Sequence, residues 1–131
     1  MIKLIITEDK LLGMDEKLPR NAFVRFINLM RAIEVLPSGM TLDPQEERLM
    51  QELALHWSRG ESVTVLSAMN MLAGASPSTV QRRLKTLRSK GLLSFEPSAQ
   101  DARVRHVVAT EQGQAYFTRM GELMREAVDR A

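Results

Sequence analysis

The chain has 131 residues, enough for one domain with a hydrophobic core, and 44% hydrophobic content excludes a disordered tail. No apolar run approaches the roughly 20 residues that span a membrane, and the first residues turn acidic too soon for a secretory signal, so we expect a cytoplasmic protein without membrane contact. The absence of cysteine excludes disulfides and thiol chemistry, and the net charge of +2 by itself says little about partners.

The distribution of charge is more informative than the total. Residues 61–110 carry 7 basic and 3 acidic side chains, whereas residues 1–60 carry 8 and 9, and residues 111–131 carry 3 and 4. The positive excess is therefore confined to the middle of the chain. Clustered positive charge is the electrostatic requirement for binding phosphates.

The N-terminal third predicts an arm followed by a helix. Residues 1–18 contain a short candidate strand at residues 2–6 and a break at Gly13, and we interpret them as an arm that packs on the body or on a partner chain. Residues 19–36 then show a helical apolar face, which Pro37 and Gly39 end. The face comprises Phe23, Phe26, Ile27, Met30 and Ile33. For Phe23 and Phe26 we expect ordinary core packing.

The next helix has a complete start signal. Asp43 is a suitable N-cap, Pro44 suits the first helical position, and Glu46 can complete a capping box. Its expected buried residues are Leu49, Met50, Leu53 and Trp57, and Gly60 ends it. The two histidines, His56 and His106, have no acidic cluster beside them, so we predict no metal site and no cofactor.

A third helix is expected from Val65 to Ala73, capped by Thr64, with Leu66, Met69 and Leu72 or Ala73 turned inward. Gly74 and Ala75 then form a tight turn that leads directly into Ser76. A helix, a short glycine-containing turn and a polar-capped basic helix are the layout of a helix-turn-helix.

The helix expected at 76–90 is the main functional candidate. Ser76 can cap it, Pro77 suits its first position, and Gly91 can end it. Val80, Leu84 and Leu87 form one apolar stripe, while the opposite face and its flanks carry Ser78, Gln81, Arg82, Lys85, Thr86 and Ser89. The segment holds five cations and no acidic residue, which suits the DNA major groove. A solvated surface helix is the alternative interpretation.

The segment 94–108 predicts a hairpin, because two β-prone runs flank a turn-rich stretch. Arg103 and Arg105 are expected on the returning strand, where they could lie along a phosphate backbone or in a minor groove. Asp101 is two residues from Arg103 and is expected to orient its guanidinium. The alternative is a surface hairpin with an ion pair worth at most about 1 kcal/mol.

The last expected helix follows the cap at Thr110. Its apolar stripe comprises Phe117, Met120, Met124, Ala127 and Val128, with Leu123 at the edge. A helix at this position usually needs a partner, and the N-terminal helix of the same or a second subunit is the expected one. The fold class is therefore mainly α with a small β-hairpin wing.

These motifs together resemble the MarR family of bacterial winged helix-turn-helix regulators. The similar parts are residues 76–80 with Leu84, Leu87 and residues 90–92, then residues 101–103, then residues 109–113, where Ala109 stands in place of the usual Leu. The resemblance implies a homodimer joined through its N- and C-terminal helices on a pseudo-palindromic operator. It also implies base reading from the helix at 76–90 and a wing contact by Arg103.

We therefore expect a sequence-specific regulator that binds double-stranded DNA and is not an enzyme. The expected regions are a dimerisation arm and helix at 1–41, a winged helix-turn-helix domain at 42–110 and a dimerisation helix at 111–131. The expected contacts are Ser76, Ser78, Thr79, Gln81, Arg82, Lys85, Arg103 and Arg105. Alternatives are a winged-helix protein–protein module and a plasmid or phage replication protein. A small-molecule effector between the dimer helices and the winged core is a further hypothesis.

Overall fold

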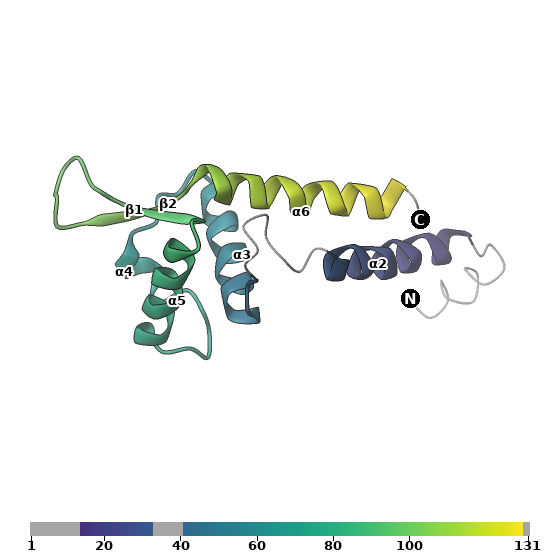
Figure 1. Cartoon of the computed structure of the whole chain (residues 1–131), viewed down its shortest axis with the longest axis horizontal. Coiled ribbons are helices and arrows are strands. Elements are labelled where there is room, and N and C mark those ends of the chain that lie inside the picture. The colour runs from purple at the N-terminus through teal and green to yellow at the C-terminus, as the bar shows by residue number, and fades with distance from the viewer. Residues whose placement is uncertain (1–13, 33–40, 130–131) are drawn as a thin grey trace, which may run out of the picture. The chain divides into compact units, whose positions relative to one another are not determined.

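The computed structural model describes residues 14–32 and 41–129 (Figure 1). Their elements, in chain order, are α2 (Met14–Ala32), α3 (Pro44–Ser58), α4 (Val65–Ala68), α5 (Pro77–Ser89), β1 (Leu93–Pro97), β2 (Arg105–Ala109) and α6 (Glu111–Asp129). The candidate strand at residues 2–6, the break at Gly13 and the stop at residues 37–39 lie outside the described residues. Two compact units make up the chain: a helical unit, Met1–Glu34 with Phe117–Ala131, and a winged unit, Val35–Tyr116.

The core of the winged unit follows the predicted stripes. Val80, Leu84 and Leu87 of α5 are fully buried, because residues spaced i, i+4 and i+7 lie on one face of a helix. Helix α5 uses this face to pack against α3, α4 and β1. The facing residues of α3, which are Leu49, Met50 and Leu53, are fully buried as expected. The two long helices of this unit are therefore held by continuous apolar contact.

The hairpin is a two-stranded antiparallel sheet with Phe95 opposite Val107. Val107 also donates a backbone hydrogen bond of 2.7 Å to Val63, and an isolated bridge joins Thr64 to His106. The base of the hairpin is therefore tied to the segment just before α4. Helices α3, α4 and α5 with this hairpin form a winged helix-turn-helix, which confirms the expected α+β fold class.

The start signals of the helices are confirmed. Asp43 and Glu46 form both halves of a capping box, with distances of 2.8 and 2.9 Å. Thr110 caps α6 by accepting the Gly113 N–H at 3.0 Å. Gly91, with φ +85°, ends α5 in a backbone conformation that side chains with a Cβ rarely adopt.

Two helix boundaries differ from the prediction. Helix α2 begins at Met14 rather than at Pro19, and Pro19 lies inside it. Pro19 has no backbone N–H, so α2 lacks one backbone hydrogen bond at this residue, but the helix continues to Ala32. Helix α4 ends at Ala68 rather than at Ala73, and Asn70 there donates a side-chain hydrogen bond to the Leu66 carbonyl. Such local side-chain bonds compete with continuation of the helix.

Three expectations about buried faces were wrong. Leu66 was expected to face inward but is 72% exposed, and Ala68 is buried in its place; Leu72 is buried as expected. In the helical unit, Phe23 is 62% exposed rather than buried. In α6, Leu123 is fully buried, whereas Met124 and Val128 are exposed. Helical periodicity identifies an apolar face, but a wide stripe leaves its centre uncertain by about one residue, or 100°.

Candidate nucleic-acid interface

Hydroxyl groups surround the first turn of α5. Ser76 accepts the Thr79 N–H at 3.2 Å and donates to the Thr79 hydroxyl at 2.9 Å, so it caps the helix as predicted. Ser76 and Ser78 are exposed, and Thr79 is half-buried. The N-terminal end of a helix carries partial positive charge and unpaired N–H groups. This end of α5 therefore offers short polar side chains and N–H donors to an anion.

Arg82 and Lys85 extend the same face towards the middle of α5. Both are exposed, on the side opposite Val80, Leu84 and Leu87, and Gln81 lies half-buried at the flank. Within the part of the chain that the structure describes, neither cation is engaged in an ion pair. Their positive charge is therefore available to a ligand.

The other three cations of this segment contact side chains of neighbouring elements. Arg83 pairs with Asp43 at 2.5 Å and donates from Nε to Gln45 at 3.1 Å. Lys90 pairs with Glu46 at 2.7 Å, and Glu46 is only 1% exposed. The guanidinium carbon of Arg88 lies 4.5 Å from the centre of the Phe95 ring. The sequence shows five cations, and the structure separates two outward ones from three that hold α5 to its neighbours.

Arg103 lies in the turn before β2, because β2 begins at Arg105; the expectation that Arg103 is part of the returning strand was wrong. Its predicted pairing with Asp101 is present. Asp101 accepts hydrogen bonds from the Arg103 backbone at 3.0 Å and from its guanidinium at 3.2 Å. The side-chain hydrogen bond from Arg103, followed by the backbone one, lowers the pKa of Asp101 below its ordinary value. The carboxylate therefore stays charged and orients a guanidinium that is 91% exposed.

Arg105 is also exposed, opposite Pro97 in the hairpin register. Arg103 and Arg105 thus both face solvent on the hairpin, within one structural unit with α5. The winged unit presents two groups of outward cations, one on α5 and one on the hairpin.

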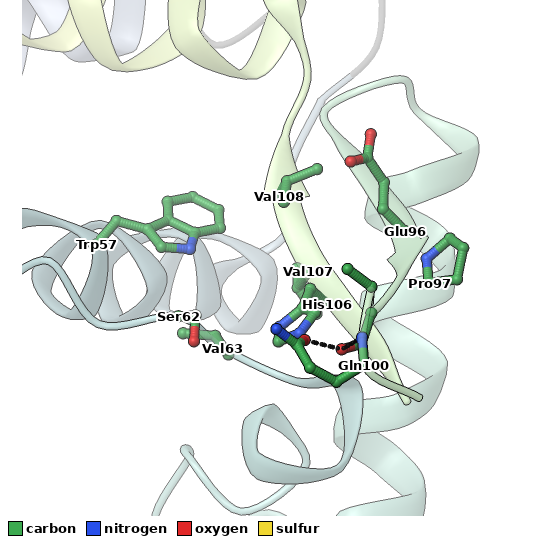
Figure 2. A pocket seen from close by; sticks show the side chains of 11 residues that line it. Trp57, Ser62, Val63, Glu96, Pro97, Gln100, His106, Val107 and Val108 are labelled. Carbon is green, nitrogen blue, oxygen red and sulfur yellow. Dashed lines mark hydrogen bonds between the residues drawn. The ribbon is translucent and has the colours of Figure 1, made fainter. Parts of the chain in front are cut away.

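An open hollow of about 510 Å³ lies between the end of α3 and the hairpin (Figure 2). Trp57 forms one side, and His106, Val108 and Gln100 are among the hairpin residues on the other. The Nδ1 atom of His106 is buried without a hydrogen-bond partner. This hollow was not predicted, since it depends on how α3 and the hairpin meet.

The described residues form neither a metal-binding cluster nor a membrane-spanning helix. No group of three or more His, Asp or Glu side chains in residues 14–32 and 41–129 could hold a metal ion. None of the described helices combines the length and the apolar character needed to cross a membrane.

Known proteins match this chain at the level of structure. No protein-family profile and no curated protein sequence matches it. The transcriptional regulator Tm0710 from Thermotoga maritima superposes with a TM-score of 0.61 and 16% identity, covering 93% of this chain and 78% of its own. The YusO protein from Bacillus subtilis superposes with a TM-score of 0.58 and 18% identity. The match covers 99% of this chain and 82% of YusO.

A probable transcriptional regulator from Pseudomonas aeruginosa gives a TM-score of 0.50 and 17% identity, covering 89% of this chain and 81% of its own. Identities this low establish the fold alone. At the level of the fold, the winged helix-turn-helix expected from the sequence is confirmed.

Proposed function

We propose that this protein is a transcriptional regulator that binds double-stranded DNA in a sequence-specific manner, without enzymatic activity. In this proposal α5, with its capping residue Ser76 and residues up to Lys90, enters the major groove. The wing at 94–108 lies on the backbone or in the minor groove. The observation that carries the proposal is the outward face of α5, where a hydroxyl-rich helix end is continuous with the exposed cations Arg82 and Lys85.

Each side chain has a role that follows from its chemistry and position. Arg82 is one turn into α5 and exposed, so it is our candidate for a bidentate contact to guanine. Gln81 can read a neighbouring base edge. Ser76, Ser78 and Thr79 suit phosphate oxygens near the helix end, and Lys85 suits a phosphate farther along. Arg103 and Arg105 suit the backbone or a narrow minor groove.

We further propose a homodimer, because the helical unit exposes large apolar side chains. Phe23, Val24, Met124 and Val128 are each between 53% and 62% exposed. Residues 1–41 and 111–131 would supply the dimer contacts, and residues 42–110 would read DNA. Two copies of α5 would then read a pseudo-palindromic site. A small-molecule effector that binds between the dimer helices and the winged core stays a prediction. It would be tested by measuring DNA affinity with and without candidate ligands.

The test starts from selection of bound fragments out of random duplex DNA, followed by affinities for the selected and a random duplex across a salt series. Arg82→Ala should cost about 1–3 kcal/mol at the selected site and relax preference at one base pair per half-site. Arg103→Ala should lower the affinity for both duplexes by the same factor. It should also reduce the slope of log affinity against log salt concentration by roughly one unit per subunit. Arg48→Ala is the matched control, because Arg48 is an exposed arginine of α3 that is assigned to neither the DNA contacts nor the dimer contacts, and it should change neither quantity.

If Arg82→Ala lowers the affinity for the selected and the random duplex equally, Arg82 contacts phosphate only. Wild-type affinity in both variants would instead favour the alternative of a winged-helix protein–protein module. Salt separates these classes further, since an apolar protein interface is much less sensitive to ionic strength than several phosphate contacts.

A further inference from the structure

Three side chains at the start of α3 hold the helix α5 at two points. Asp43 and Gln45 bind Arg83 in the middle of α5, and Glu46 binds Lys90 at its end. Arg83 and Lys90 are seven residues apart, so the two contacts are about two helical turns apart on α5. Two attachment points restrict both rotation and tilt of a helix, whereas one point restricts neither fully.

These contacts are built into the local structure of α3. Asp43 uses Oδ1 to cap α3 by accepting the Glu46 N–H, and it uses Oδ2 to pair with Arg83. Glu46 likewise accepts the Asp43 N–H with the same Oε1 that binds Lys90. The two carboxylates are therefore oriented by the helix start before they meet α5. Preorganised acceptors of this kind fix their partners more closely than mobile surface carboxylates do.

Arg83 lies between the outward residues Arg82 and Lys85, but its own side chain points back to α3. Its guanidinium bridges Gln45 through Nε and Asp43 through Nη1. A rotation of α5 about its axis would move Arg82 and break both contacts. The position of the outward face is thus coupled to this pairing.

We propose that Asp43, Gln45 and Glu46 are positioning residues that set the orientation of α5, and thereby the preference of this protein for its cognate DNA over random DNA. The inference rests on the proposed DNA binding by α5. A base contact by Arg82 requires a fixed direction, while a phosphate contact tolerates several. Loosening α5 should therefore reduce discrimination between sequences more than it reduces total affinity.

The first test uses two variants, of which only one changes the net charge of the protein. Asp43→Asn keeps a side-chain oxygen to cap α3 but removes the charge that pairs with Arg83. Loss of one negative charge and release of Arg83 should raise affinity for a random duplex. Arg83→Lys keeps the charge but loses the planar fork that bridges two acceptors. Despite this difference, both variants should lower the ratio of cognate to random affinity by about tenfold.

The matched control is Glu52→Gln, which removes a negative charge from the same helix at a residue without an ion pair among the described residues. It should raise both affinities slightly and leave their ratio unchanged. The double variant D43N/R83K should lower the ratio no further than either single variant, because both remove one shared interaction. Thermal unfolding of each variant checks that the fold is retained.

The outcomes separate the inference from the function on which it rests. If Asp43→Asn and Arg83→Lys keep the wild-type ratio while the wild type selects a defined sequence, the positioning role is overturned and DNA reading stands. If their ratios fall additively in the double variant, the shared-interaction argument is overturned. If the wild type binds no duplex above background, the proposed function and this inference are overturned together.

Discussion

The two units of the chain differ in how completely they cover their own apolar surface. In the winged unit, the inward residues of α3 and α5 are fully buried, and long polar side chains at the edge of α5 pair with neighbouring elements. Among its described large apolar side chains, Leu55 and Leu66 are more than half exposed, and they are separate positions on α3 and α4. In the helical unit, Leu123 and Ala127 are buried, but Phe23, Val24, Met124 and Val128 are more than half exposed. The contrast indicates that the winged unit can fold on its own contacts, whereas the helical unit has surface left for a partner.

The largest expected effect tests the closed core of the winged unit. Leu84→Ala should lower the free energy of unfolding by about 2–5 kcal/mol, because Leu84 is fully buried and the cavity it leaves can collapse only partly. Leu66→Ala, at a residue that is 72% exposed in the same unit, should change stability by less than about 0.5 kcal/mol. Urea denaturation monitored by circular dichroism measures both. Similar losses at the two positions would contradict the assigned core.

The next effect compares two glycines of α6, one from each unit. Gly113 lies in the winged unit, and a Cβ there would overlap the Leu92 carbonyl oxygen and approach Ala109 to 3.3 Å. Gly113→Ala should therefore lower the free energy of unfolding by about 1–3 kcal/mol. Gly121 lies in the helical unit, and no atom of the described residues lies within 4 Å of a Cβ added there.

Gly121→Ala should accordingly stabilise by about 0.5–1 kcal/mol, since alanine is the better helix former. Thermal unfolding of the two variants gives the comparison directly. Destabilisation by Gly121→Ala would mean that the exposed side of α6 is covered in solution at this position, and would extend the expected dimer contact to it.

The third prediction concerns the open surface of the helical unit. Replacing both Phe23 and Met124 with serine should raise the dimer dissociation constant by at least about tenfold, since buried aromatic and methionine side chains contribute strongly to interfaces. Leu55→Ser is the matched control, because Leu55 is 52% exposed but belongs to the winged unit. Sedimentation velocity over a concentration series measures the equilibrium. A wild-type monomer at tens of micromolar, a generous concentration for a stable interface, would rule out the proposed dimer.

The smallest effect is at the solvent-exposed tip of the hairpin. Arg103→Ala should raise the pKa of Asp101 towards its ordinary value, because the largest cause of its lowering is removed. A depressed pKa means that the carboxylate adds stability above its unfolded-state pKa, and that this is lost as the pH falls through the folded-state value. Arg105→Ala should leave the pKa of Asp101 unchanged, because Arg105 does not contact Asp101 in the described structure. A carbon-detected NMR titration of both variants would show whether the ion pair exists in solution.

Local signals predicted most of the winged unit. The caps at Asp43, Thr64 and Ser76 marked helix starts because each polar side chain bonds to the backbone three residues away. The spacing of Val80, Leu84 and Leu87 marked the buried face of α5. These features depend on neighbours in the chain, so sequence alone contains what is needed to predict them.

Other features depend on residues far apart in the chain. Arg83 and Gln45 are 38 positions apart, and nothing in either segment indicates that a cation of α5 turns towards α3. Counting the five cations of residues 76–90 therefore overestimated the charge that this segment leaves free. The face of α6 was misplaced by about one residue for a related reason, since periodicity cannot tell which part of a wide apolar stripe meets the neighbouring helix.

Trp57 has a practical consequence through its place beside the hairpin (Figure 2). It is the single tryptophan of the chain, and its amphipathic indole forms one side of the hollow that His106 and Val108 complete. Its fluorescence therefore comes from one place only, at the base of the hairpin. Emission spectra of the unlabelled protein can follow movement of the hairpin in real time, with no dye attached to the surface whose contacts are to be measured.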